Sequence, residues 1–199
     1  MKDTKNIKKF LNTVFARKVT VINAIIVLIF IFLAIFAPFV APYDPDKPDF
    51  AAFLQLPSAA HVLGTDNFGR DVLSRIIYGT RVSLIIGVLA VVVACAVGTV
   101  LGMIAGYFGG WIDDVITRLM EAVRAIPQII LAMALTAVFG SGIRNLAIIL
   151  GISSMAGYVR MMRGQVLTIK QADYIMAGKL QGNKDFRLMF RHILPNSIS

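Results

Sequence analysis

Long apolar stretches without charged residues are the feature that most constrains this chain. None of the 25 residues from Val19 to Tyr43 and none of the 31 from Val82 to Ile112 is Asp, Glu, Lys or Arg. About 18 such residues are enough to cross the hydrocarbon core of a bilayer as a helix. Charged residues make up 16% of the chain, against about 25% in soluble domains. We therefore predict an all-α, polytopic transmembrane protein embedded in a lipid bilayer.

Four membrane-spanning helices are expected. They cover residues 19–43, 82–112, about 112–139 and about 146–159, and the last continues for a further turn. The first is longer than the roughly 7–15-residue apolar core of a signal peptide, so we interpret it as an uncleaved helix. Pro127 is expected to kink the third span, because proline removes one helix hydrogen bond and clashes with the preceding turn.

The distribution of basic residues predicts the orientation. Residues 1–18 hold six basic and one acidic residue, residues 41–81 hold four and five, and residues 160–199 hold seven and two. Lys and Arg concentrate on the cytoplasmic side of membrane proteins. We therefore expect residues 1–18 to form a cytoplasmic N-terminus and residues 44–81 to form an extracytoplasmic loop.

Small residues at four-residue intervals predict close helix packing in the second span. Residues four apart share a helix face, and glycine lets two backbones approach closely. The set consists of Ala90, Ala94, Gly98, Gly102, Gly106 and Gly110. We interpret it as a packing ridge within residues 82–199, which are expected to form a core of three spans and a cytoplasmic segment. A subunit interface is the alternative.

Ionisable residues are scarce in the expected spans. Ion-driven transporters and proton pumps need such groups deep in the membrane, but the first, second and fourth spans contain none. Glu121 and Arg124 lie three residues apart in the third span, where we expect a local ion pair. If this chain takes part in transport, the energy is expected to come from another protein.

The loop at 44–81 contains a stretch whose glycine spacing matches that of a phosphate-binding loop. Gly64 and Gly69 have the required spacing. However, Arg70 and Asp71 replace the lysine and the hydroxyl residue of such loops, and no strand is expected before them. We therefore reject a nucleotide site in this loop.

The same loop contains three side chains of types that bind metals. His61, Asp66 and Asp71 lack a compact ligand spacing, so we expect them to form turns and helix caps instead. The spans contain no paired carboxylates and the chain shows no Ser/His/Asp set. The sequence therefore predicts neither a metal site nor a catalytic residue, and we expect that the chain is not an enzyme.

An apolar stripe lies at the end of the loop. Val72, Ile76, Ile77 and Val82 share one face of a helix, and the charged residues lie off that face. This pattern predicts a short amphipathic helix that lies on the outer surface of the membrane.

The segment at 172–196 is half polar, unlike the spans before it. "ADYIMAGKLQ" is helix-like and stops at Gly182, where we expect a sharp turn with positive φ. Asn183 is expected to cap a second helix. The predicted apolar face of that helix comprises Phe186, Met189, Phe190, Ile193 and Leu194. Periodicity leaves two interpretations open: the segment docks into a groove of a cytoplasmic partner, or it lies on anionic lipid.

This segment resembles the EAA motif of ABC importer permeases. "DYIMAGKLQG" supplies the alanine Ala177 and the glycine Gly182, and "HILPN" follows after nine residues. Three positions depart from the pattern, since Met176 replaces the glutamate, Gly178 the second alanine and His192 the isoleucine. The loss of the glutamate puts one polar contact in doubt, but not the docking mode.

Two other stretches are similar to the second permease subunit of the peptide/nickel branch of this family. They are "HVLGTDNFGRDVLSRIIYGTRVSL" and "GYVRMMRGQVL". Together with the EAA-like segment, the resemblance covers about residues 37–196. It implies the all-α fold of type I importer permeases, which usually has six spans.

The resemblance also implies partners and a location. Such permeases pair with a second, related permease and receive cargo from an extracytoplasmic solute-binding protein. Two cytoplasmic ABC ATPase subunits bind ATP and Mg, so that no cofactor, metal or nucleic acid is expected on this chain. The implied location is the cell membrane of a prokaryote. ATPase contacts are expected at Asp173, Met176, Ala177, Gly178, Lys179 and Gly182.

Two questions stay open at the level of sequence. The chain contains four of the usual six spans, so we expect that it cannot by itself form a complete half of a translocation pathway. Peptide is favoured as the cargo over nickel, although no residue decides between them: His61 and His192 are the only histidines, and neither lies in a span. A membrane channel or scaffold that docks a cytoplasmic partner without ATP is the alternative from another class.

Overall fold

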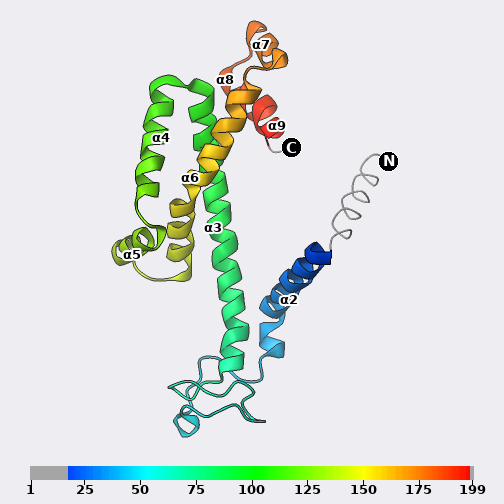
Figure 1. Cartoon of the computed structure of the whole chain (residues 1–199), viewed down its shortest axis with the longest axis vertical. Helices are drawn as coiled ribbons and strands as arrows, with labels where there is room; N and C mark the ends of the chain where they lie inside the picture. Colours follow the sequence, from blue (N-terminus) through cyan, green and yellow to red (C-terminus); the bar gives the residue numbers. More distant parts are fainter. Residues whose placement is uncertain (1–17, 198–199) are drawn as a thin grey trace. The chain divides into compact units, whose positions relative to one another are not determined.

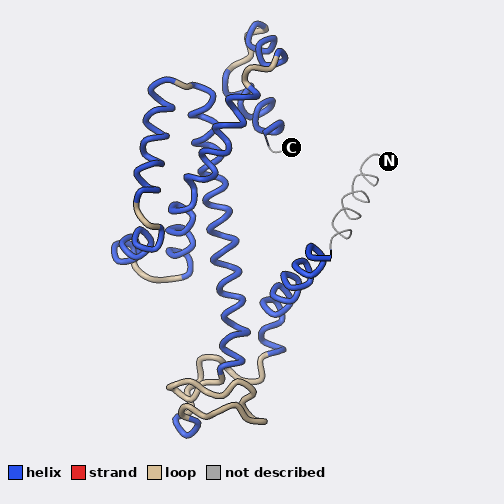
Figure 2. Tube along the Cα trace, in the orientation of Figure 1, coloured by secondary structure: helices blue, strands red, loops and turns tan. Residues whose placement is uncertain are grey.

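Helices dominate the part of the chain that the structure describes. The computed structural model describes residues 18–197, and Figure 1 shows the order of its helices. Loops join the helices, and no strand occurs between residues 18 and 197 (Figure 2). The prediction of an all-α protein is therefore confirmed. The chain divides into two compact units, one ending at Ile85 and the other starting at Ile86.

Helix α2 (Lys18–Val40) belongs to the first unit. Its side chains are almost all apolar, and only Ala34 and Ala37 are buried, which is typical of a helix that faces lipid. The helix ends before Tyr43, the predicted boundary. Because Ala41 precedes Pro42, its backbone disfavours the helical conformation, and α2 ends one residue earlier.

Helix α3 (Val72–Phe108) is continuous over 37 residues. Its start is fixed by Asp71, whose Oδ2 accepts a hydrogen bond of 2.7 Å from the Ser74 backbone N–H. Residues 72–81 are thus the first turns of α3, and the separate surface helix that the stripe predicted does not form. The reason is that no proline interrupts the sequence from Val72 to Phe108, and extending a helix is cheap once it has nucleated.

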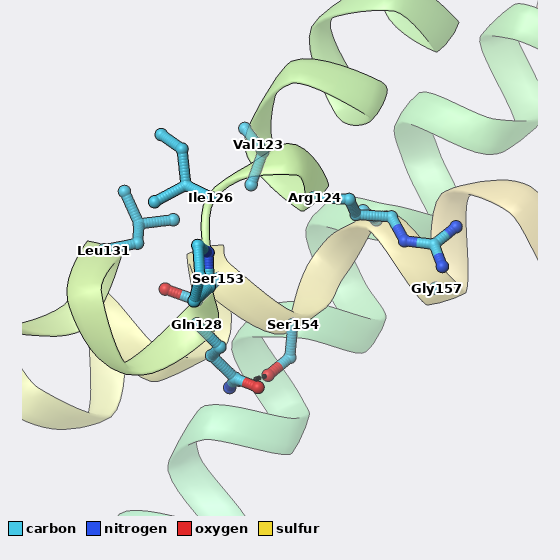
Figure 3. Close-up of a pocket in the computed structure, with 10 residues that line it drawn as sticks. Val123, Arg124, Ile126, Gln128, Leu131, Ser153, Ser154 and Gly157 are labelled. Carbon is cyan, nitrogen blue, oxygen red and sulfur yellow. Dashed lines mark hydrogen bonds between the residues drawn. The ribbon is translucent and has the colours of Figure 1, made fainter.

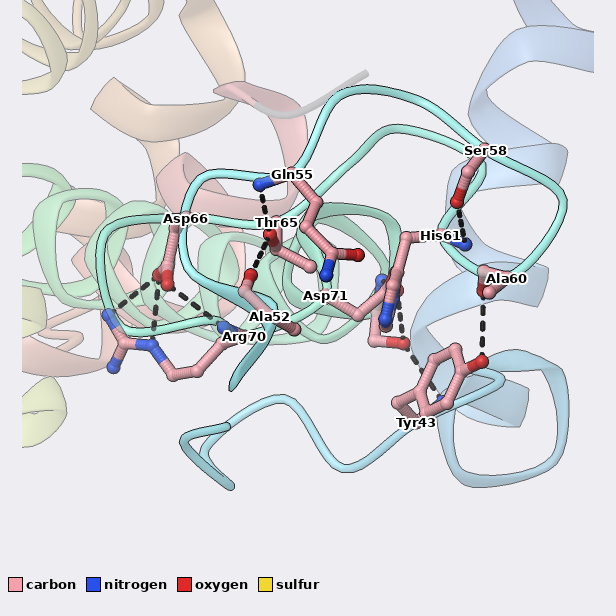
Figure 4. A network of polar contacts seen from close by, with 11 residues as sticks. Tyr43, Ala52, Gln55, Ser58, Ala60, His61, Thr65, Asp66, Arg70 and Asp71 are labelled. Atoms are coloured by element: carbon pink, nitrogen blue, oxygen red, sulfur yellow. Dashed lines mark hydrogen bonds and ion pairs between the residues drawn. The ribbon is translucent and has the colours of Figure 1, made fainter. Parts of the chain in front are cut away.

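The loop before α3 is held by short-range polar contacts. It contains the 3-10 helix η1 (Phe50–Ala52), and the Thr65 hydroxyl donates to the Ala52 carbonyl (Figure 4). Gly69 has φ +72°, and a Cβ there would lie 1.6 Å from the carbonyl oxygen of Asp49. Glycine at position 69 therefore allows two segments of the loop backbone to come into contact. This contact explains why Gly69 occurs in the stretch that resembles a phosphate-binding loop.

The second unit continues with four helices after α3. These are α4 (Gly110–Ala125), α5 (Gln128–Phe139), α6 (Ile143–Ile169) and α7 (Asp173–Leu180). The chain then forms α8 (Asp185–Leu188), the π-helix η2 (Met189–Ile193) and α9 (Leu194–Ser197). Helix α6 is longer than the predicted fourth span.

The structure breaks the predicted third span in two. Helices α4 and α5 meet at an angle of 95° around Ile126 and Pro127, as a proline at this position favours. Within residues 18–197, α2, α3 and α6 are each long and apolar enough to cross a membrane. The α4–α5 pair brings the number to four if it counts as one bent span.

Glycines bring α3 and α6 into close contact, and the two helices lie side by side in Figure 1. A Cβ on Gly98, Gly102 or Gly106 would lie within 3.0 Å of atoms of α6. Farther along, Gly151 of α6 lies as closely against the backbone of Ala90. The ridge thus runs from Ala90 to Gly106 and faces another helix of the same chain.

Gly110 does not belong to this ridge. Helix α3 ends at Phe108, and Gly109 and Gly110 both have positive φ, so the four-residue spacing no longer places Gly110 on the same face. No atom lies within 4 Å of the position of a Cβ on Gly110. Gly110 therefore makes no such contact with another helix in the described part of the chain, and it starts α4.

Candidate functional site

The candidate site is the segment 172–196, which follows α6 and packs against the end of α3. Ile175 of α7 is fully buried. It belongs to an apolar cluster that joins α3, α6, α7 and the residues after α7. The cluster consists of Met103, Tyr107, Met162, Val166, Ile175, Leu188, Met189 and Ile193. The segment is therefore anchored to the helices rather than free in solution.

Helix α7 presents its other faces outward. Asp173 and Ala177 are exposed, Met176 is 56% exposed and Leu180 is 89% exposed. An apolar helix face that is exposed beside an anchored residue is suited to docking on a partner. Five of the six predicted contact residues are thus exposed: Asp173, Met176, Ala177, Lys179 and Gly182.

Two of the predicted contact residues, Lys179 and Gly178, also make contacts within the chain. Lys179 places its Nζ 4.9 Å from the centre of the Tyr107 ring, in a cation–π contact. Gly178 faces Leu188, since a Cβ at 178 would lie 2.9 Å from Leu188 Cδ2. Lys179 and Gly178 therefore help to hold α7 in place, whatever else they touch.

A hydrogen-bonded turn ends α7. Gly182 has φ +77°, its N–H donates to the Lys179 carbonyl at 3.0 Å, and the Asn183 N–H donates to the Gly178 carbonyl at 3.2 Å. This pair of bonds is the Schellman arrangement, which favours glycine at the residue with positive φ. The expected turn at Gly182 is present.

The predicted cap at Asn183 is wrong. Asn183 Nδ2 donates to the Gly178 carbonyl at 3.1 Å, so its side chain closes the end of α7 instead of starting α8. Helix α8 begins after Lys184 without a side-chain cap. The physical reason is that the turn brings the free carbonyls of α7 within reach of the asparagine amide.

The predicted apolar stripe of the last helix is also partly wrong. Leu188, Met189 and Ile193 are buried, whereas Phe186 is 71% exposed and stacks on Phe190 with ring centres 4.4 Å apart. The π-helix at Met189–Ile193 has a wider turn than an α-helix, so Leu188 and Ile193, five residues apart, share the buried side. A count at 3.6 residues per turn therefore omitted Leu188.

Polar contacts that the sequence analysis missed tie the segment to the spans. The Tyr107 hydroxyl donates to Asp185, and Lys170 Nζ donates to the Gly106 carbonyl at 2.9 Å, near the end of α3. These partners are 78 and 64 residues apart in the chain, and no short-range sequence pattern relates them.

A bidentate ion pair joins α4 to α6. Arg163 donates through Nε and Nη2 to the two carboxylate oxygens of Asp113, at 2.5 and 2.6 Å, and the Thr117 hydroxyl donates to Asp113 at 3.1 Å. Such forked pairs fix the orientation of both groups. The first turn of α4 is thereby fixed to α6.

The loop residues that could have suggested a metal site form caps and turns (Figure 4). His61 Nδ1 lies 3.0 Å from Asp71 Oδ1, and Asp71 Oδ2 is taken by Ser74. Burial by itself raises the pKa of Asp71, but hydrogen bonds from Ser74 and His61 lower it below its usual value. Within residues 18–197, no group of three or more His, Cys, Asp and Glu side chains is arranged to hold a metal ion.

Two protein families match this sequence. The profile described as "binding-protein-dependent transport system inner membrane component" matches residues 98–199, which is 102 of the 199 residues. A second profile, "N-terminal TM domain of oligopeptide transport permease C", matches residues 7–57. The resemblance to importer permeases is confirmed.

Curated relatives of this chain are named as permease proteins of transport systems. The chain is 42% identical over 182 residues to a dipeptide transport system permease protein DppC of Alkalihalophilus pseudofirmus. The aligned residues cover 92% of this chain and 60% of that relative. It is 39% identical over 193 residues to a glutathione transport system permease protein GsiD of Pectobacterium atrosepticum, covering 96% of this chain and 64% of the relative. This chain thus spans about three fifths of the length of these relatives. The chain belongs to the family of binding-protein-dependent transport system inner membrane components.

Proposed function

We propose that this chain is a transmembrane subunit of an ATP-driven ABC importer and forms part of a translocation pathway for peptides. The support comes from relatives named as dipeptide and glutathione transport permeases, which are 39–42% identical to it. The helices that are long and apolar enough to cross a membrane are consistent with this role. The role in transport is assigned to the assembled importer, because this chain spans only part of its relatives.

We further propose that α7 is the element that receives motion from a cytoplasmic ATPase subunit. The observation that carries this proposal is the anchoring of Ile175 in the apolar cluster beside the exposed residues Met176, Ala177 and Leu180. A push on the exposed face is transmitted to α3 and α6 because close-packed interiors deform little. ATP and Mg are then bound by two partner ATPase subunits.

The remaining partners follow from the same assignment. A second permease completes the pathway, and an extracytoplasmic solute-binding protein delivers the peptide. The importer lies in the cell membrane of a prokaryote, with the N-terminus and residues 172–196 in the cytoplasm and the 44–81 loop outside. The excess of basic residues in 1–18 and 160–199 supports this orientation.

Co-purification with an ABC ATPase tests the role of α7. We expect Met176→Asp and Ala177→Asp to weaken association with the ATPase about tenfold or more, because a charge is buried without a partner at the docked face. Gln171→Asp, which adds the same charge at an exposed position before α7, is the matched control and should associate normally.

Normal ATPase binding by both α7 variants would refute the docking role. Failure of the wild-type chain to associate with any ABC ATPase encoded beside it would instead favour a channel or scaffold that works without ATP.

A further inference from the structure

The break between α4 and α5 borders a cavity in the second unit (Figure 3). Its volume is about 390 Å³, and its lining includes Ile126 and Pro127 of the break and Gly157 of α6. Non-helical backbone within a membrane is tolerated where it is buried in protein or lines a water-filled cavity. The location of the break beside a cavity is therefore physically consistent with a polar chamber within the bent span.

Polar side chains from three helices border this cavity. Gln128 of α5 donates through Nε2 to the Ser154 hydroxyl of α6 at 3.1 Å, as Figure 3 shows, and Ser153 lies beside Ser154. Arg124 of α4 is the cation of the lining. Polar groups within spans normally face the protein interior or water, because contact with lipid is costly.

Arg124 lacks a counter-ion in the described part of the chain. The sequence predicted an ion pair with Glu121, but the ion pairs formed between residues 18 and 197 do not include it. That prediction is wrong, and Arg124 instead borders the cavity, whose lining does not include Glu121. No carboxylate is part of the lining either.

We propose that this cavity binds the carboxylate of a peptide cargo through the Arg124 guanidinium, with Gln128 and the serine hydroxyls as further hydrogen-bonding groups. The inference rests on the proposed function and names the chemistry of its site. Arg124 is exposed in this chain and so accessible to a ligand, and a guanidinium pairs with a carboxylate in a forked geometry. A volume of about 390 Å³ is at the small end for ligand pockets, as suits a short peptide.

Peptide uptake by the assembled importer tests this inference. The assay compares a dipeptide that has a free C-terminal carboxylate with the same dipeptide amidated, each at a concentration that saturates the solute-binding protein. We expect Arg124→Gln to lower uptake of the free acid about tenfold or more, the factor for one lost charge-assisted hydrogen bond, and to leave uptake of the amide unchanged. Arg124→Lys should retain part of the acid uptake.

Two further arms make the test specific. An amidated dipeptide with an acidic side chain distinguishes the sources of the carboxylate: it should respond to Arg124→Gln only if the side-chain carboxylate can occupy the site. Arg144→Gln, on an exposed arginine of α6 outside the lining, should import both peptides as the wild type does.

The possible contrary results distinguish failure of the carboxylate site from failure of the proposed transport function. If the wild-type importer takes up peptide and Arg124→Gln keeps the same ratio of acid to amide uptake, the inference is wrong and the proposed function stands. An equal loss of acid and amide uptake also overturns it, and points to a pairing of Arg124 with a partner permease. If the wild-type importer takes up no peptide, the proposed function fails as well.

A second pair of variants tests the cavity independently of charge. No atom lies within 4 Å of the position of a Cβ on Gly157 or Gly164, both on α6, but only Gly157 lines the cavity. We expect Gly157→Leu to reduce peptide uptake about tenfold by occupying the chamber, and Gly164→Leu to have no such effect. Equal uptake by the two variants would show that the cavity is not part of the path.

Discussion

At the scale of single residues, Asp66 organises the loop before α3. Its Oδ1 accepts hydrogen bonds from the backbone N–H groups of Phe68 and Arg70, at 2.8 and 3.0 Å. Its Oδ2 accepts from the guanidinium groups of Arg70 and Arg75. Partial withdrawal from water raises the pKa of Asp66, but these hydrogen bonds outweigh it and hold the pKa well below the usual range.

Acid should therefore loosen this loop. Because the folded loop lowers the pKa of Asp66, the ionised carboxylate stabilises the loop above pH about 4, the value for a free aspartate, and this stabilisation is lost as the pH falls further. We expect the hydrogen-exchange protection factors of the Phe68 and Arg70 amides to fall below pH about 4. The Asp66→Asn variant cannot ionise, so its protection should change much less over the same range. Identical pH profiles for the two proteins would contradict this account.

At the scale of elements, contact between α3 and α6 depends on glycine. A Cβ on Gly102 would lie 2.4 Å from the Val159 carbonyl oxygen and 2.9 Å from Met162 Cβ, so the two helices would have to separate. Gly87 lies on the same helix, but no atom is within 4 Å of the position of its Cβ. The two glycines therefore differ in surroundings although both are helical.

This difference predicts opposite effects of the same substitution. Gly102→Ala should destabilise the protein by about 1–3 kcal/mol, as overpacking does. Gly87→Ala should be neutral or stabilise it by up to about 1 kcal/mol, because alanine favours helix. Thermal unfolding in detergent, followed by circular dichroism, measures both. A Gly102→Ala protein that melts at or above the wild-type temperature would exclude the close contact.

The same two helices show what sequence patterns can and cannot predict. The spacing of small residues predicted a ridge on α3, because residues four apart share a face in any α-helix. The spacing could not show that the helix ends at Phe108, which removes Gly110 from the ridge. In the segment after α7, a local π-helix changed the number of residues per turn. Nothing in the amino-acid composition predicted this π-helix.

At the scale of the whole molecule, the arrangement of charge along the chain predicts the topology. In the proposed orientation the 44–81 loop is outside and residues 172–196 are in the cytoplasm. The chain has one native cysteine, Cys95, which is exposed on α3, so labelling needs a Cys95→Ser background.

A cysteine at Lys47 should react with a membrane-impermeant maleimide in intact cells. A cysteine at Gln181, at the end of α7, should react only after the cells are permeabilised. Both positions are exposed, so a difference in labelling reports the side of the membrane rather than burial. The reverse pattern would invert the topology.

The sequence by itself determined the fold class, the approximate spans, the family and the turn at Gly182. These properties depend on local chemistry: uncharged apolar length suits a bilayer, and a positive φ suits glycine. The tertiary structure alone decided which side of α7 is buried and which groups Asp113, Tyr107 and Lys170 contact. It alone also showed that Arg124 borders a cavity and is not paired with Glu121. These depend on contacts between residues far apart in the chain, for which periodicity and composition carry no information.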